Sequence, residues 1–591
     1  AVLVEKQEEG FTRHQVSNLS LISNSTEANR LRILSTEWLA VLAIYFFAVL
    51  IRYAIFIVTP YWSGDEFVYK TIASGIWQYG QHGVLTDTQI SHSVDIPNLL
   101  YPYLISPAFI LGENFYFGIR FINSIVINMA IFPCYLIARK FLTRNNAIVA
   151  STIALAIPFI NIGAFAVTEV LFFPLFLLSV WIAIESNERP HSVTWFAAFG
   201  IVAAILLNVR LNALVLLPTF LISFLWLSIL RKQVKDFFIR PYWLIAVVSF
   251  LIAYVFLQYI IFDRSIGDAG VYSHHINLSE SLFSILINNP RGVFHLISGH
   301  ITTLAIPFAL PIALMISAII TNRNKRIIDV KIYDFLTIVV FFSSALFLLS
   351  ILFTIKVSPV DLGGLGRWHS RYYFYFYPLI IIAWVVFTER FERREKSNHY
   401  IVLGIVALIM ITNIYFIKFY DALNNPWFGS IVDNMDIQWY RLTISFYWPF
   451  VIFTIALSWL WFKRSAYFKR SLFFFIATWI VVANFGALWV SKVGSLTKDN
   501  MCGILSYQFL DHNPGRFVVV GDSRTTMVSA SFWNKYIPER AFIYNDKIQP
   551  LVPAVVGVST NYLITNGDIK VDAIYNPLLS IGKCTIYEQR N

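Results

Sequence analysis

Long apolar stretches constrain this chain more than any other feature of its sequence. Crossing a hydrocarbon core about 30 Å thick takes roughly 20 apolar residues in a helix. Thirteen segments have about this length, near 37–60, 115–138, 146–165, 166–184, 194–208, 212–230, 242–262, 300–321, 335–356, 372–388, 400–418, 444–462 and 471–491. Only 13% of the residues are charged, against roughly 25% in soluble domains. The sequence therefore predicts an all-α polytopic membrane domain over residues 37–491.

Basic residues predict how this domain lies in the membrane. They cluster in every second connection, as in 231–240, 323–331 and 390–396, whereas the longer connections between these carry few. Cytoplasmic loops of membrane proteins are enriched in Lys and Arg, so we expect residues 1–36 to form a cytoplasmic arm. The net charge of +11 is then cytoplasmic anchoring charge and does not indicate a nucleic-acid partner. With thirteen spans, the last hundred residues lie outside. The three cysteines and the absence of an obvious targeting tail suit a bacterial inner membrane protein.

Residues 492–591 have a different pattern and predict a small external α/β domain. Short β-rich runs at 516–521, 541–544, 562–565 and 584–587 alternate with possible helices at 500–511 and 524–537. Cys502 and Cys584 lie near the two ends of this domain, in a compartment that permits oxidation. They are candidates for a disulfide joining its first helix to its last strand, with two free thiols as the alternative. Ser523 has no G-x-S-x-G context, which favours a structural turn over a nucleophile.

The first external loop, residues 61–113, contains the most informative motif. Asp65 and Glu66 follow directly after the first span and are surrounded by aromatic residues. Adjacent carboxylates at a membrane surface repel each other and are partly desolvated. A general base that activates a hydroxyl explains them, while the alternative is a solvated helix start, where acids are favourable. Segments 66–80 and 98–112 of this loop read as interfacial helices.

Other charged residues lie at external ends of predicted spans. Glu169 lies at the turn between the third and fourth spans, and Arg210 at the turn between the fifth and sixth. Before the tenth span, the segment Gly363-Gly-Leu-Gly-Arg-Trp-His-Ser-Arg-Tyr-Tyr contains Arg367, His369 and Arg371. Arginine binds phosphate bidentately, although its long side chain can also reach an interface without any ligand. His92, Asp95, His274 and His275 lie in external loops and are weaker candidates.

This layout resembles the GT-C glycosyltransferases, among them the protein O-mannosyltransferases, the lipid A aminoarabinose transferases and the arabinofuranosyltransferases. The resemblance covers the whole membrane domain in layout but few residues in motif. It implies transfer of a sugar from a polyprenyl-phosphate carrier to a glycan, lipid or protein acceptor at the external face. Asp65 is then the general base of an inverting displacement and Glu66 orients the acceptor or Asp65. Glu169 contacts a sugar hydroxyl, and Arg210, Arg367 and Arg371 hold the lipid phosphate.

The resemblance leaves open whether the transferase uses a metal and whether the chain is instead a transporter or a ligase. The oligosaccharyltransferase catalytic subunits, similar in topology, hold a divalent metal with D-x-D motifs. Asp65-Glu66 is not such a motif, which favours a metal-independent transferase without a cofactor. A glycan transporter or flippase would place ionisable residues inside its spans, where we expect only Arg52. An O-antigen ligase would use lipid-linked sugars but would not require the Asp-Glu pair.

Overall fold

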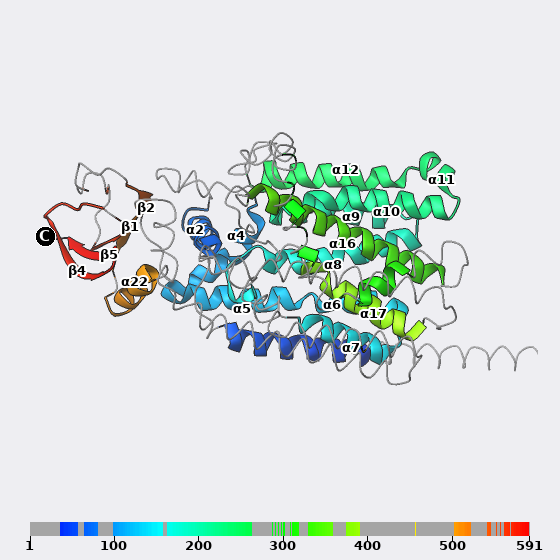
Figure 1. Cartoon of the computed structure of the whole chain (residues 1–591), viewed down its shortest axis with the longest axis horizontal. Helices are drawn as coiled ribbons and strands as arrows, with labels where there is room; N and C mark the ends of the chain where they lie inside the picture. The colour runs from blue at the N-terminus through cyan, green and yellow to red at the C-terminus, as the bar shows by residue number, and fades with distance from the viewer. Residues whose placement is uncertain are drawn as a thin grey trace, which may run out of the picture.

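The computed structural model describes residues 36–56, 64–80, 98–157, 162–262, 311–317, 329–357, 374–390, 501–513, 515–521, 540–544, 561–567 and 569–589. It also describes residues 456, 551 and 556 and separate positions between 287 and 310. Figure 1 shows a bundle of roughly parallel helices with a small sheet domain beyond one of its ends. Helices α2 and α4 lie at the sheet end of the bundle, whereas α11 lies at the opposite end.

The bundle begins with the helix Thr36–Phe56. The first half continues with α2 (Gly64–Tyr79), α4 (Leu100–Ile105), η2 (Ser106–Asn114), α5 (Phe115–Asn128), α6 (Ile131–Phe141), α7 (Arg144–Leu155) and α8 (Glu169–Glu188). The second half comprises α9 (Val193–Val209), η4 (Leu211–Val215), α10 (Leu216–Leu230), α11 (Val234–Ile239), α12 (Tyr242–Val255), η5 (Phe256–Ile261), α16 (Val330–Val357), η9 (Phe374–Phe376) and α17 (Tyr377–Arg390).

Six helical segments of the described residues are long and apolar enough to cross a membrane. They are Thr36–Phe56, Phe115–Phe141, Glu169–Glu188, Leu211–Leu230, Tyr242–Ile261 and Val330–Leu352. Each overlaps a predicted span, so the helical membrane domain is confirmed. Shorter apolar helices cover Val193–Val209 and Phe374–Phe387, close to two more. Apart from residue 456, the last three predicted spans lie outside the described residues, and the total of thirteen stays a prediction.

One predicted span differs from the structure. The expected helix 146–165 ends at Leu155, where α7 stops. Pro158 explains this end, because the residue before a proline disfavours helical backbone and proline has no N–H to donate. Residues 162–168 then return toward α8 without α-helical structure. Irregular backbone inside a membrane domain needs partners from the protein itself, and the partners of this segment form the candidate site.

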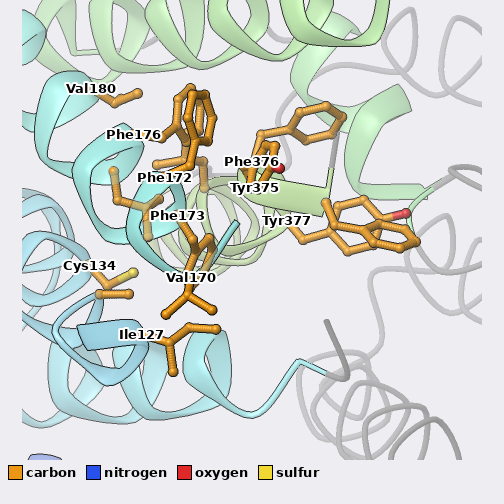
Figure 2. Packing of buried hydrophobic residues seen from close by; sticks show 14 of the residues in the cluster. Ile127, Cys134, Val170, Phe172, Phe173, Phe176, Val180, Tyr375, Phe376 and Tyr377 are labelled. Carbon is orange, nitrogen blue, oxygen red and sulfur yellow. The ribbon is translucent and has the colours of Figure 1, made fainter. Parts of the chain in front are cut away.

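Aromatic packing between α8 and the start of α17 forms the centre of the core (Figure 2). Phe172, Phe173 and Phe176 of α8 are completely buried, and Tyr375 of η9 lies with its ring centroid 4.6 Å from that of Phe172. Proline at position 174 does not interrupt α8. This contact fixes η9, and hence the start of α17, against the first turns of α8.

The C-terminal domain is a five-stranded sheet preceded by α22 (Met501–His512). Its strands are β1 (Phe517–Gly521), β2 (Arg540–Ile543), β3 (Tyr562–Asn566), β4 (Tyr575–Ile581) and β5 (Cys584–Gln589), in the order β2-β1-β3-β5-β4. β1 pairs in parallel with β2 and β3, while β5 pairs antiparallel with β3 and β4. All five residues of β1 are buried, as expected for a central strand covered on both faces.

The four predicted strands and the helix 500–511 are present, so the α/β class is confirmed. β4 was not predicted because Pro577 lies inside it, and proline is tolerated only at sheet edges and bulges. β4 is an edge strand, and its register shifts between Pro577 and Leu579. Cys502 and Cys584 form a disulfide with their Cα atoms 5.2 Å apart. It joins α22 to β5 and closes a loop with a sequence separation of 82 residues.

Candidate active site

Glu66 joins the first external loop to other parts of the membrane domain through buried hydrogen bonds. It lies in the first turn of α2, where an acid is favourable, and its side chain is only 3% exposed. The Tyr116 hydroxyl of α5 and the Ala166 N–H both donate to Glu66 Oε1, the latter at 2.7 Å. One carboxylate therefore ties α2 to α5 and to the non-helical segment before α8.

Side chains of α5 hold the rest of that segment. Asn123 Nδ2 donates to the carbonyl oxygens of Gly163 at 3.1 Å and Phe165 at 2.8 Å. Arg120 Nε donates to the Ala164 oxygen at 3.3 Å. Three successive carbonyls are thus satisfied by side chains, as backbone without α-helical hydrogen bonds in a membrane domain requires. The segment is fixed in place directly before Glu169.

Glu169 and Arg210 form a buried ion pair. Arg210 Nη1 lies 2.5 Å from Glu169 Oε1, and their side chains are 12% and 2% exposed. Arg210 Nη1 also donates to Thr168 Oγ1 at 3.2 Å. Glu169 is the first residue of α8, and Arg210 follows the last residue of α9. These two residues, from turns 41 positions apart in the sequence, therefore meet in the structure, a contact that the sequence analysis did not predict.

Tyr101 interacts electrostatically with both carboxylates. Its hydroxyl donates to Asn123 Oδ1 at 2.9 Å and lies within electrostatic reach of both Glu66 and Glu169. Complete burial, with these two negative charges, raises the pKa of Tyr101 well above its ordinary value. The phenol therefore stays protonated and remains a hydrogen-bond donor across the physiological pH range. It places Glu66 and Glu169 in one electrostatic environment.

Lys70 brings a cation to the same helix as Glu66. It lies one turn further along α2 and is 3% exposed. Burial lowers the pKa of Lys70 to about 8, while the negative charge of Glu66 opposes the shift. The buried groups thus include two cations, Lys70 and Arg210, and two carboxylates, Glu66 and Glu169.

The structure describes three of the predicted site residues with their side chains: Glu66, Glu169 and Arg210. Asp65 lies in the first turn of α2, and its side chain lies outside the description. The other candidates fall outside the described residues: His92, Asp95, His274, His275, Arg367, His369 and Arg371. Among the described residues, no group of three or more His, Cys, Asp or Glu side chains is arranged to hold a metal ion.

Sequence reasoning missed several members of this cluster. Tyr101, Tyr116, Asn123 and Lys70 were not singled out, and Arg52 was taken as the only charge inside the spans. That was wrong, because Arg120 lies within the predicted span 115–138 and is 1% exposed. A charged residue within an apolar stretch is itself a signal of function or of a buried polar network. For Arg120, the network is the backbone before α8.

Comparisons with known proteins agree with this architecture. Residues 95–259 match the family described as dolichyl-phosphate-mannose-protein mannosyltransferase. No curated protein matches the sequence. ArnT from Cupriavidus metallidurans bound to undecaprenyl phosphate has 11% sequence identity and a TM-score of 0.55, over 92% of this chain and 97% of ArnT. This similarity confirms the predicted GT-C-like fold.

Two further solved structures have lower scores. The apo state of the same ArnT has 11% identity and a TM-score of 0.49, over 94% of this chain and 98% of ArnT. The apo oligosaccharyltransferase of Archaeoglobus fulgidus has 11% identity and a TM-score of 0.41, over 84% of this chain and 64% of that protein.

Proposed function

We propose that the chain is a GT-C membrane glycosyltransferase that transfers a sugar from a polyprenyl-phosphate carrier to an acceptor hydroxyl. Its GT-C-like fold and the family match at residues 95–259 support this proposal. The single observation that carries this proposal is that Glu66 and the buried Glu169–Arg210 pair lie on either end of the segment 166–169 and that both carboxylates act electrostatically on Tyr101. Buried ionisable groups in a membrane domain are expensive and are usually functional. Here they gather where α2, α8 and α9 begin or end.

Asp65 is the proposed general base. It precedes Glu66, whose carboxylate is engaged by Tyr116 and Ala166, so the backbone that carries Asp65 is held by its neighbour. An Asp65 carboxylate oxygen takes the proton of the acceptor hydroxyl while the acceptor oxygen attacks the anomeric carbon. The bond from that carbon to the phosphate oxygen breaks on the opposite face. The polyprenyl phosphate leaves with the bonding electrons, and the anomeric configuration inverts.

Arg210 is the proposed cation for the departing phosphate. Arginine stabilises developing phosphate charge when it is already positioned in a site of low dielectric constant. Glu169 and Thr168 provide that positioning in the absence of a ligand. A phosphate that binds to Arg210 competes with Glu169, and this competition makes the Glu169 carboxylate available to a sugar hydroxyl.

Arg371 is the proposed second cation. It belongs to the segment directly before η9, whose Tyr375 packs on Phe172 near the Glu169 end of α8. Arg367 and His369 belong to the same segment and are proposed to line the phosphate side.

The proposed donor is a sugar linked to undecaprenyl phosphate or a similar polyprenyl phosphate. It is supported by the fold shared with ArnT, which was crystallised with undecaprenyl phosphate. We place the site at the external face of a bacterial inner membrane, because the basic loops predict that sidedness. The reaction that we propose needs no divalent metal, since base, cation and leaving group are all supplied without one.

The test is transfer from synthetic undecaprenyl-phosphate sugars to an acceptor by the purified full chain, with and without a chelator. Asp65→Asn should reduce transfer by about 10²- to 10⁴-fold, as expected for loss of a general base. Asp236→Asn, on exposed α11 at the other end of the bundle, is the matched control and should leave transfer unchanged. Full activity of Asp65→Asn would refute the assignment, and loss of activity with chelator would refute the metal-independent mechanism. Sugar-lipid transport without a glycoside product would instead indicate a transporter.

A further inference from the structure

Three buried carboxamides lie where α9 ends before Arg210. They are Asn98 before α4, Asn208 in α9 and Gln258 in η5, with exposures of 5%, 1% and 3%. Burying an uncharged amide in an apolar environment is unfavourable unless its hydrogen bonds are made. Three such groups at one place in a membrane domain therefore require a structural or a functional explanation.

Two of the amides fix each other. Gln258 Nε2 donates to Asn208 Oδ1 at 2.6 Å, and Asn208 Nδ2 donates to the Ala204 oxygen of its own helix at 2.9 Å. Gln258 lies in η5, a π-helical turn at the end of α12. Such turns are rare and occur frequently at functional sites. The pair joins α9 to α12, and its hydrogen bonds offset the unfavourable burial of the two amides.

Asn98 is different, because within the described residues only the NH2 group of its amide makes a hydrogen bond. Asn98 Nδ2 donates to the Leu207 oxygen at 2.7 Å. A carbonyl can only accept, so this bond fixes which end of the amide is nitrogen and which is oxygen. Asn98 Oδ1 is buried and has no hydrogen-bond partner in the described part of the chain. An unsatisfied buried acceptor is unfavourable by about 1–3 kcal/mol, and helix-to-helix contact alone does not explain it.

Asn98 is linked to the candidate site through the chain and through its hydrogen bond. Tyr101, three residues later, interacts electrostatically with both Glu66 and Glu169. Leu207, which accepts from Asn98, lies three residues before Arg210. Asn98 is thus hydrogen-bonded to the segment that leads to the proposed phosphate cation, and it lies three residues before Tyr101 in the chain.

We propose that Asn98 Oδ1 accepts a hydrogen bond from a hydroxyl of the donor's sugar, which makes Asn98 a specificity-determining residue. This proposal rests on the proposed function, since it assumes a lipid-phosphate sugar at Arg210. An oriented acceptor suits a sugar hydroxyl, which donates one hydrogen bond. It does not suit the phosphate, which offers only acceptors. Asn98 therefore contributes to recognition of the sugar and not of the lipid phosphate.

The experiment compares the affinities of the full chain for two kinds of lipid. The probes are undecaprenyl phosphate itself and the same lipid carrying mannose, arabinofuranose or 4-amino-4-deoxyarabinose. For the sugar-linked probe that the wild type binds most tightly, Asn98→Leu should weaken binding by about 5- to 30-fold. Its affinity for bare undecaprenyl phosphate should stay the same.

Asn187→Leu is the matched control. Asn187 is also buried with an unpartnered Oδ1 in the described part of the chain, but it lies near the far end of α8, about 27 Å from Glu169. This variant should not change the ratio of the two affinities. Equal weakening of both probes by Asn98→Leu, or no change in either, would overturn the role of Asn98. Failure of the wild type to bind any probe would instead refute the proposed function.

Discussion

Replacing Glu66 by glutamine tests whether Glu66 positions the first external loop or takes part in the proton transfer. The carboxylate accepts hydrogen bonds from the Tyr116 hydroxyl and the Ala166 N–H. Glutamine keeps an oxygen in the same place, so both bonds can persist without the negative charge. Hydrogen bonds to charged groups contribute about 1.5–3 kcal/mol each and neutral ones about 1 kcal/mol. We therefore expect Glu66→Gln to lower the free energy of unfolding by about 2 kcal/mol.

Glu66→Ala should be more destabilising, because it removes the acceptor altogether. The Ala166 N–H and the Tyr116 hydroxyl would then be buried without this partner, which costs about 1–3 kcal/mol for each group. The sum of about 2–6 kcal/mol is a large part of the stability of a typical domain. The assay is unfolding by titration with sodium dodecyl sulfate in mixed micelles, combined with transfer activity of the folded fraction.

The free energy of unfolding and the transfer activity should respond differently to substitution of Glu66 and of Asp65. Folded Glu66→Gln should retain transfer within about tenfold of the wild type, because the loss of a true general base costs 10²- to 10⁴-fold. Asp65→Asn should show the reverse pattern, with normal unfolding and little transfer. If Glu66→Gln unfolds like the wild type yet transfers as poorly as Asp65→Asn, Glu66 takes part in the proton transfer and the positioning argument is wrong.

Three further perturbations test other contacts. Burial lowers the pKa of Lys70 to about 8 from 10.5, so the unfolded chain binds this proton more tightly than the folded chain does. The free energy of unfolding should therefore rise by about 3 kcal/mol between pH 8 and 10.5. The free energy of unfolding of Lys70→Met should lack this rise. Cys502→Ser opens a loop with a sequence separation of 82 residues and should destabilise the C-terminal domain by up to about 4.5 kcal/mol, measured by its thermal unfolding. A side chain at Gly200 would bring its Cβ within 2.1 Å of the Ala246 oxygen, so Gly200→Val should separate α9 from α12 and lower yield and melting temperature, whereas Ile201→Val on the exposed face should not.

The sequence predicts much of the fold because its signals there are local. The interfacial segment 66–80 corresponds to α2, and 98–112 corresponds to α4 with η2. Apolar length and alternation with turns are readable without tertiary information. Helix 146–165 was wrong although its local signal, Pro158, is in the sequence, because the apolar run continues beyond that residue.

The candidate site was less predictable because its geometry depends on contacts between distant segments. Glu66 meets Ala166 across 100 positions, and no local pattern indicates such a pair. Tyr101 and Asn123 look like ordinary residues of apolar helices until the structure brings them to the segment before α8. The sequence shows which charged residue lies at a helix end, but it does not show which residue that charge contacts.

The most direct measurement is an electron cryo-microscopy or crystal structure of the full chain with undecaprenyl phosphate bound. The account predicts a phosphate oxygen within about 3 Å of the Arg210 guanidinium, with Asp65 on the side where an acceptor would approach. It also predicts that the Arg210–Glu169 distance increases from 2.5 Å as the phosphate replaces the carboxylate. A phosphate bound at the α11 end of the bundle, with the Glu169–Arg210 pair unchanged, would contradict the account.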